Sequence, residues 1–256
     1  MAANKTIVLI TGANQGLGYY AAQQLAATGK YHTLVGSRDI GKAERAIESL
    51  ANDASVKVNA DSLEPIQIDV TSDESIKAAA QTVEKKHGKL DILMNNAGIA
   101  GGQAAATDGS GPSLREIYRQ HYDTNLFGAA QVTETFLPLL RKSTVPGGKR
   151  IAFTSSGLSS LQWAAEDEPN MNAANYPIYR STKTALNMIM LYYVKTLEKE
   201  GFVVSASDPG YCATNLNDNN GYKDPRDGAE VLVRAAVEDK EAVHGRVVDE
   251  NGPEPW

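Results

Sequence analysis

Two side chains suited to acid–base chemistry, Tyr179 and Lys183, stand four residues apart in a segment that predicts a helix. At that spacing both side chains project from the same helix face. A nearby ammonium group favours the phenolate, so we expect Lys183 to lower the pKa of Tyr179 from its ordinary value of about 10. A phenol tuned in this way can give and take a proton during catalysis. Because such pairs also occur by chance, their meaning depends on the rest of the chain.

A glycine-rich loop near the N-terminus predicts a phosphate-binding turn. It follows a β-branched apolar run at residues 5–11, typical of a strand buried on both faces of a parallel sheet, and it leads into a helix at residues 17–28. In this context backbone N–H groups at the helix N-terminus can cradle a pyrophosphate; the alternative is a plain tight turn. The loop residues expected at the cofactor are Gly12, Asn14, Gln15, Gly16, Leu17 and Gly18.

The end of the second predicted strand, residues 32–36, carries Ser37, Arg38 and Asp39. In a dinucleotide-binding fold this position faces the adenosine ribose, where an acidic residue accepts from the 2′-hydroxyl and an arginine meets a 2′-phosphate. Asp39 is better placed as the N-cap of the helix that follows. Arg38 therefore favours NADP(H) over NAD(H), the alternative being a solvated surface arginine.

Polar residues also mark the ends of later strands. Residues 65–70 predict a strand that ends in Asp69 and Val70, and Thr71 to Glu74 predicts the capping box of the next helix. Residues 90–98 predict a further strand.

The end of the strand predicted at residues 90–98 carries Asn95 and Asn96, which would brace neighbouring strands or touch a ligand. A helix predicted at residues 113–141 holds Asn125 among apolar neighbours, which raises the question of what it bonds.

The second half of the chain continues the alternation of strands and helices. Strands are predicted at residues 150–156, 202–207 and 245–248, and helices at residues 179–201 and 227–238. The pattern predicts an α/β fold, a single doubly wound parallel sheet (Rossmann fold) with helices on both faces, forming one domain over residues 1–256. An insertion at about residues 158–177 and a polar substrate loop at about 211–227 interrupt it.

The helix at residues 179–201 is apolar nearly all round, which indicates burial against the sheet on one side and a partner subunit on the other. We therefore expect a homo-oligomer, a dimer or a tetramer.

Composition narrows the classes of function. The 256-residue chain has a single cysteine, Cys212, four scattered histidines and a net charge of −6, so we expect no internal disulfide, no metal site and no nucleic-acid partner. It has neither a run of eighteen apolar residues nor a secretory signal pattern, so we expect no membrane partner and a cytoplasmic location. A small-molecule partner fits this composition best.

Taken together, the motifs resemble the classical short-chain dehydrogenase/reductase family over nearly the whole chain. The resemblance rests on residues 11–18, Asp69, residues 95–98, Asn125, Ser156, Tyr179, Lys183, Pro209, Gly210 and Thr214. The glycine spacing is the family's own and differs from G-x-G-x-x-G. The resemblance implies further cofactor contacts from Ser37, Arg38, Asp69, Val70, Asn96, Ala97, Gly98, Tyr179, Lys183, Pro209, Gly210 and Thr214.

The resemblance also implies a reaction: NADPH-dependent reduction of a ketone or aldehyde to an alcohol. Tyr179 would give the carbonyl oxygen its proton, and Ser156 would hydrogen-bond that oxygen as charge develops. Lys183 would lower the tyrosine pKa and hold the nicotinamide ribose, while Asn125 would fix a water that relays protons. Two alternatives are an NAD(P)-dependent alcohol dehydrogenase that works in the oxidative direction, and a cofactor-binding sensor without turnover.

Two assignments within the site stay open. Tyr176 is a rival to Tyr179, although the residue four positions after it is Arg180, not a lysine. Ser155 competes with Ser156 because Gly157 follows immediately, whereas the family places a variable pair before its glycine.

The insertion before Tyr179 is longer than the family's usual loop, as in its carbonyl-reductase-like branch, where similar but longer insertions cover surface otherwise used for tetramer contacts. The insertion should shape the substrate pocket. Trp163 and Tyr176 are candidate walls, unless they simply pack the inserted segment.

Overall fold

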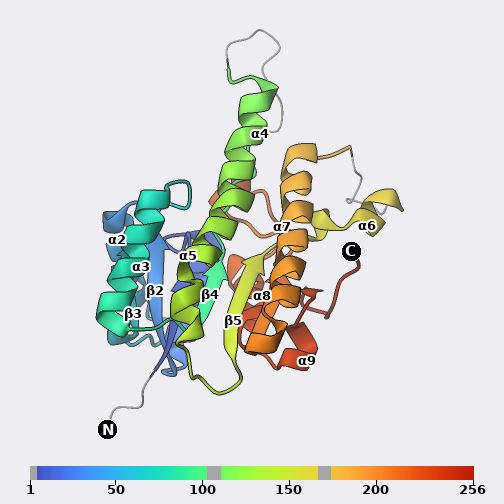
Figure 1. Ribbon diagram of the computed structural model, residues 1–256. Coiled ribbons are helices and arrows are strands. Elements are labelled where there is room, and N and C mark those ends of the chain that lie inside the picture. Colours follow the sequence, from blue (N-terminus) through green and yellow to red (C-terminus); the bar gives the residue numbers. More distant parts are fainter. Residues whose placement is uncertain (1–4, 103–110, 167–173) are drawn as a thin grey trace.

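A seven-stranded, all-parallel sheet forms the centre of the molecule (Figure 1). The computed structural model describes residues 5–102, 111–166 and 174–256. The strands are β1 (Thr6–Ile10), β2 (Tyr31–Ser37), β3 (Leu63–Gln67), β4 (Ile92–Asn95), β5 (Lys149–Thr154), β6 (Phe202–Ser207) and β7 (Val247–Val248), in the order β3-β2-β1-β4-β5-β6-β7. The predicted doubly wound parallel sheet is confirmed.

Helices cover both faces of the sheet. They are α1 (Gly16–Ala27), α2 (Ile40–Asn52), α3 (Asp73–His87), α4 (Leu114–Tyr122), α5 (Ala129–Arg141), α6 (Leu161–Ala165), α7 (Pro177–Thr196), α8 (Pro225–Val237) and α9 (Lys240–Val243). Helices α3, α5 and α7 pack on one face and α1, α2 and α8 on the other. In β1, for example, Leu9 joins the first core, whereas Val8 and Ile10 join the second, because successive strand residues point to opposite faces.

The strand order reverses direction at the centre of the sheet, between β1 and β4. From β1 the chain winds outward through β2 and β3, and then returns to the other side of β1 with β4. In such sheets ligands bind outside the carboxyl ends of the strands, where the winding reverses. Helix α4 rises beyond this edge of the sheet (Figure 1). The polar strand ends noted in the sequence therefore gather at one edge.

The helix predicted at residues 113–141 contains a feature that the sequence did not reveal. Between α4 and α5 the backbone forms a π-helical turn, Asp123–Gly128, which contains Asn125. Gly128 allows this turn to approach the segment after β3, because a Cβ there would lie 2.6 Å from the carbonyl oxygen of Val70. π-turns inside α-helices are frequent at functional sites.

The predicted capping box at Thr71–Glu74 is wrong by one residue. Ser72 is the N-cap of α3 and accepts a hydrogen bond from the backbone N–H of Ser75. Thr71 instead bonds to Asp69, since its N–H and hydroxyl donate to Asp69 Oδ1 at 2.9 and 2.7 Å.

Other helix bounds also differ from prediction. Helix α7 ends at Thr196 and not at Gly201, and a 3-10 turn, Glu198–Glu200, fills the interval. Helix α8 begins at Pro225, since Asp224 caps it by accepting from the N–H of Arg226.

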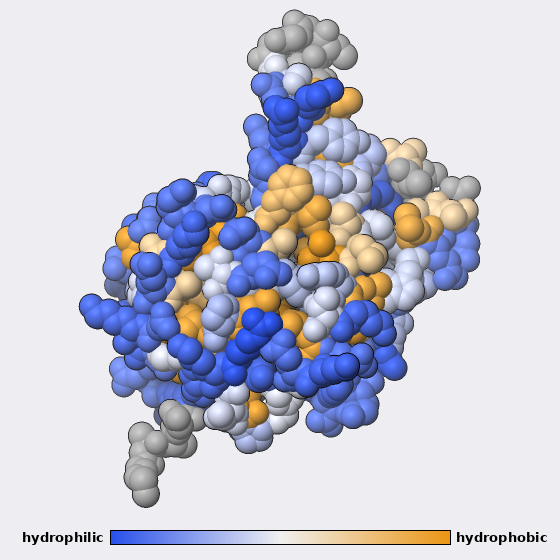
Figure 2. Space-filling model, viewed as in Figure 1, coloured by the Kyte–Doolittle hydropathy of each residue, from blue (hydrophilic) through white to orange (hydrophobic). Residues whose placement is uncertain are grey.

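The outer surface of α7 carries exposed apolar side chains. Met188 and Tyr192 are 64% and 50% exposed, and Phe127, in the neighbouring π-turn, is 56% exposed. Figure 2 shows apolar residues gathered at the middle of this face. No helix in the described ranges combines the length and apolar character needed to span a membrane.

Candidate active site

Helix α7 positions the tyrosine and the lysine. The helix starts with Pro177 at its first turn, and the two side chains follow on one face. Lys183 is 3% exposed, its ammonium nitrogen lies 5.6 Å from the centroid of the Tyr179 ring, and it donates a hydrogen bond of 2.6 Å to the carbonyl oxygen of Thr154 at the end of β5. The structure thus brings the predicted pair together at the carboxyl edge of the sheet.

The pKa of Tyr179 moves in the direction opposite to the one predicted. Burial raises it above the ordinary phenol value, the negative charge of Asp208 raises it further, and a hydrogen bond with Ser156 acts in the lowering direction. Burial also lowers the pKa of Lys183 to about 8, although Asp208 opposes that change. The loss of solvation of the phenolate is therefore the largest influence on the pKa of Tyr179.

The structure separates the two candidate serines. Ser155 is 1% exposed, and its hydroxyl donates to Asn187 Oδ1 at 2.6 Å, inside the packing between β5 and α7. Ser156 hydrogen-bonds with Tyr179, and its Oγ also accepts from the N–H of Leu158. Ser156 is therefore the serine that lies beside the tyrosine.

Replacing each serine by alanine should give opposite results. We expect Ser155→Ala to cost about 1–3 kcal/mol of unfolding free energy, because the buried Asn187 oxygen loses its donor, with little change in kcat. We expect Ser156→Ala to lower kcat by about 10²–10³-fold, as for other donors to a developing oxyanion, with a smaller stability loss. Urea unfolding and steady-state kinetics of the two variants check this; a large kcat loss in Ser155→Ala would contradict it.

Asn125 uses both amide hydrogens and one lone pair of its Oδ1 within the protein. Its Oδ1 accepts from the N–H of Ile99 at 2.8 Å, and its Nδ2 donates to the carbonyl oxygen of Ile99 at 2.9 Å and to Thr182 Oγ1 at 3.1 Å. These bonds join the π-turn to the segment after β4 and to α7. The side chain therefore positions the helix that carries Tyr179.

The glycine loop lies against the end of β4. Gly12 and Gly16 have φ of 64° and 60°, the left-handed region that favours glycine. A Cβ on Gly18 would lie 2.5 Å from Asn96 Nδ2 and 2.9 Å from the carbonyl oxygen of Gly12. Asn96 Nδ2 donates to the carbonyl oxygens of Thr11 and Gly12, at 2.9 and 3.2 Å.

Asn96 thus holds the loop itself, while Asn95 braces the sheet by donating to Thr133 Oγ1 at 2.9 Å. Ala97 packs against the glycine loop, since a Cβ on Gly12 would lie 3.0 Å from Ala97 Cα. Gly98 lies near the lysine, since a Cβ there would lie 3.7 Å from Lys183 Nζ. Of the remaining loop residues, Asn14 and Leu17 are partly buried and Gln15 is exposed.

The end of β2 has the predicted arrangement. Asp39 caps α2 by accepting from the N–H of Lys42 at 3.2 Å, and Ser37 is buried, with its Oγ accepting from the N–H of Asp39. Arg38 is exposed, and no ion pair to its guanidinium is present within the described part of the chain. A loop with glycines at its most crowded positions, followed by an exposed arginine, could hold a dinucleotide that carries a 2′-phosphate.

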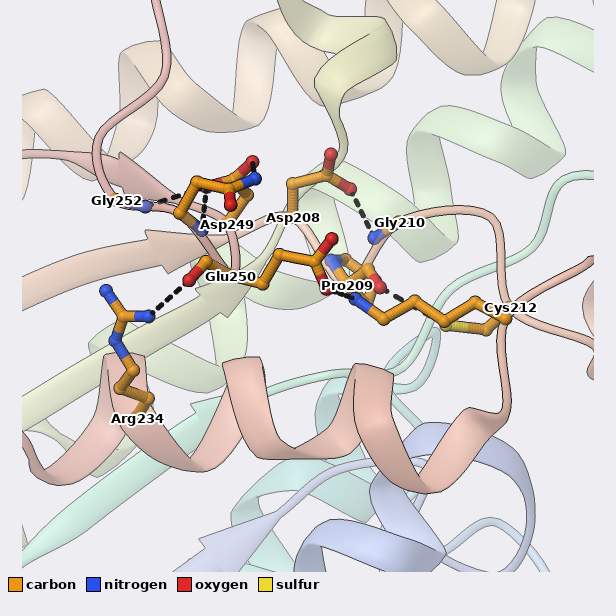
Figure 3. A network of polar contacts seen from close by, with 10 residues as sticks. Asp208, Pro209, Gly210, Cys212, Arg234, Asp249, Glu250 and Gly252 are labelled. Atoms are coloured by element: carbon orange, nitrogen blue, oxygen red, sulfur yellow. Dashed lines mark hydrogen bonds and ion pairs between the residues drawn. The ribbon is translucent and has the colours of Figure 1, made fainter.

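The segment after β6 lies beside the glycine loop. Gly210 has a φ of 77°, and its N–H donates to Asp208 Oδ1 at 2.9 Å (Figure 3). Thr214 packs near the glycine loop, since a Cβ on Gly16 would lie 3.7 Å from Thr214 Cγ2. Asn215 donates to Gln15 Oε1 at 3.3 Å, which links the two segments directly.

The predicted substrate loop is anchored at its base. Cys212 pairs with Lys223 in a β-bridge, and the ammonium of Lys223 contacts Glu250 at 2.7 Å (Figure 3). The buried thiol of Cys212 donates to the carbonyl oxygen of Pro209, and burial raises its pKa to about 11, so the thiol stays protonated.

Sequence reasoning missed a carboxyl pair at the site, Asp208 and Glu254. Burial raises the pKa of Glu254 to about 9, and the charge of Asp208 and a hydrogen bond with it add to the effect. These surroundings favour the protonated form of the Glu254 carboxyl. It lies on the C-terminal segment, which returns to β7 by a hydrogen bond from the Glu254 N–H to the carbonyl oxygen of Val247. No local sequence pattern predicts this return.

The insertion is tied to the site by Arg180. Its guanidinium donates to the carbonyl oxygens of Asn175 and Leu158, at 2.8 and 3.1 Å, on the two sides of the insertion. Tyr176 is 52% exposed and adopts the left-handed conformation ahead of α7, so it does not share the position of Tyr179. Residues 167–173 of the predicted insertion lie outside the described residues.

Comparisons with known proteins agree with this geometry. Residues 6–224 match the short chain dehydrogenase family. The chain is 44% identical over 252 residues to the short-chain dehydrogenase anuI of Penicillium roqueforti, covering 97% of this chain and 96% of that protein.

Among solved structures, salutaridine reductase from Papaver somniferum superposes with a TM-score of 0.77 at 25% identity, covering 95% of this chain and 99% of that one. The NADPH-bound carbonyl reductase from chicken fatty liver superposes with a TM-score of 0.79 at 24% identity, covering 98% and 99%, and shows the same fold. The chain therefore belongs to the classical short-chain dehydrogenase/reductase family, whose members are oxidoreductases that act on carbonyl and alcohol groups with a nicotinamide cofactor.

Proposed function

We propose that the protein reduces a ketone or aldehyde to an alcohol with NADPH. The observation that carries this proposal is the convergence of Tyr179, Ser156 and Lys183 at the carboxyl edge of the sheet, where the glycine loop also ends. The name of salutaridine reductase, a similar protein, is consistent with the reductive direction.

A bound NADPH would supply the hydride that goes to the carbonyl carbon. Tyr179 holds the proton that goes to the carbonyl oxygen, and its raised pKa keeps it protonated, which suits a proton donor in the reductive direction. Ser156 donates to the same oxygen as negative charge develops there. Asn125 fixes the π-turn against α7 and would position a water that returns a proton to the site.

The roles proposed for the remaining residues concern the cofactor. Lys183 would hold the nicotinamide ribose, and Asp69, Val70, Pro209, Gly210 and Thr214 would line the dinucleotide along the strand ends. The insertion and the segment at residues 211–227 would shape the substrate pocket of a single domain. The exposed face that includes Met188 and Tyr192 would bury against a second copy of the chain.

Arg38 provides a test of cofactor choice. We expect Arg38→Ser to weaken NADPH binding by about 10–100-fold, the value of a charged hydrogen bond to phosphate, while NADH binding changes little. Fluorescence titration of both cofactors measures this, with Arg246→Ser, at an exposed arginine beside β7, as the matched control. Equal losses for NADPH and NADH would contradict the assignment.

The lowered pKa of Lys183 predicts a pH dependence. Its ammonium is charged below about pH 8 and loses its proton above it, so the charge that strengthens its hydrogen bonds to the cofactor should be lost on the alkaline side. We therefore expect kcat/KM for NADPH to fall above that pH, since this parameter reports groups of the free enzyme. A profile that stays level to about pH 10, near the ordinary lysine value, would show that Lys183 keeps its charge.

The proposed reaction is tested by a screen of NADPH consumption over ketones, aldehydes and quinones. Turnover that Tyr179→Phe removes would support it. Preferential turnover of alcohols with NADP or NAD would favour the oxidative direction. Cofactor binding without turnover of any carbonyl or alcohol would favour a sensor.

A further inference from the structure

A second cluster of chemically active side chains lies far from the proposed catalytic residues. His32 is the second residue of β2, Glu64 the second residue of β3, and His87 the last residue of α3. All three stand at the amino ends of their strands or at the helix end beside them, whereas Tyr179 lies at the carboxyl edge. The sequence predicted no metal site because the histidines are far apart along the chain; the fold brings two of them together.

The two imidazoles converge on one carboxylate oxygen. His32 Nε2 and His87 Nε2 each lie 3.1 Å from Glu64 Oε2. The three ligand atoms lie within 4.8 Å of one another, and the rings have centroids 5.2 Å apart. The side chains are 15–20% exposed, so they are held in place yet reachable from solvent.

We propose that His32, Glu64 and His87 form a binding site for a divalent transition-metal ion, with Zn²⁺ as the preferred occupant. Imidazole and carboxylate together suit Zn²⁺. With metal–ligand bonds of about 2.1 Å, neighbouring ligand atoms of a tetrahedral centre lie roughly 3.4 Å apart. The observed separations of 3.1 Å are close to that value, so small side-chain rotations would admit the ion, and water would complete its coordination.

Lys86 sets the strength of this site. Its ammonium contacts the other oxygen of Glu64 at 2.6 Å, and it would repel a divalent cation. Its side chain is 53% exposed, so it can turn away into solvent when the ion binds. The two cations thus compete for one carboxylate, which gives a substitution that should tighten metal binding.

The site's place in the fold assigns it a stabilising role. β3 is the edge strand of the sheet, and an ion here would tie it and β2 to the C-terminal end of α3. Binding to the folded state alone should raise Tm by roughly 5–10 °C at a hundredfold excess of free ion over Kd. Since the cluster is remote from Tyr179, we expect kcat to stay unchanged.

The test is a titration of the chelator-treated, full-length protein with Zn²⁺ by calorimetry and with Co²⁺ by visible absorption. We expect one ion per chain, affinity lowered at least about tenfold in His32→Gln and His87→Gln, and affinity raised several-fold in Lys86→Gln. His244→Gln, which alters a histidine beside β6, is the matched control and should bind as the unaltered protein does.

Several results would overturn the proposal. Absence of stoichiometric binding in both the unaltered protein and Lys86→Gln would do so, and the exposed position of Lys86 makes that variant safe for folding. Unchanged affinity in folded His87→Gln, or loss of binding in His244→Gln, would place the ion elsewhere. A Zn²⁺-dependent rise in Tm that persists in His32→Gln would reject the stabilising role.

Discussion

Replacing Tyr179 by phenylalanine is expected to lower kcat for carbonyl reduction by about 10²–10⁴-fold, the range that a positioned general acid contributes. The ring stays, so its packing beside Lys183 is kept, while the proton that goes to the carbonyl oxygen is lost. NADPH affinity should change little because the lysine and the glycine loop are untouched. Steady-state kinetics and fluorescence titration of NADPH measure the two effects separately.

Tyr176→Phe is the matched control for this substitution. It removes the same hydroxyl from a tyrosine three residues earlier that is 52% exposed, and it should leave kcat near that of the unaltered protein. Comparable losses in the two variants would reject Tyr179 as the proton donor. Loss of NADPH binding in Tyr179→Phe would instead assign the residue mainly to the cofactor.

Replacing Gly18 by alanine is expected to weaken NADPH binding by about 5- to 150-fold, because an overpacked Cβ costs about 1–3 kcal/mol and displaces the loop that cradles the cofactor. The added methyl group would lie 2.5 Å from Asn96 Nδ2 and 2.9 Å from the carbonyl oxygen of Gly12, and neither can move without breaking a hydrogen bond or shifting backbone. Calorimetric titration with NADPH measures the loss.

Gly29→Ala is the control that separates an effect on NADPH binding from an effect on the stability of the protein. Gly29 has a φ of 71° with no atom within 4 Å of its Cβ position, so alanine there strains the backbone without touching the loop. We expect that variant to lose stability, by about 1 kcal/mol, and to bind NADPH normally. Unimpaired binding in Gly18→Ala would show that the loop does not form the pyrophosphate site.

The fold could be predicted because its main signals are local. The apolar run of β1, the glycines that follow it and the cap at Asp39 each depend on a few adjacent residues. The alternation of such units is enough to predict a parallel sheet, since parallel strands need helical crossovers.

Other features depended on contacts between distant segments. The π-turn at Asn125 forms where Gly128 meets Val70, and the separation of Ser155 from Ser156 depends on Asn187 in a helix later in the chain. The carboxyl pair at Asp208 depends on the return of the C-terminal segment. A pattern of adjacent residues in the sequence predicts none of these distant contacts.

The sequence by itself determined which residue types meet at the site: a tyrosine and a lysine one helical turn apart, a glycine loop after a strand, and an arginine at the next strand's end. Only the tertiary structure decided their electrostatics. Burial and the charge of Asp208 raise the pKa of Tyr179, although the spacing from Lys183 had predicted the reverse. Spacing along a helix is local, whereas desolvation depends on everything that packs around a group, so only the folded chain could fix the direction of that shift.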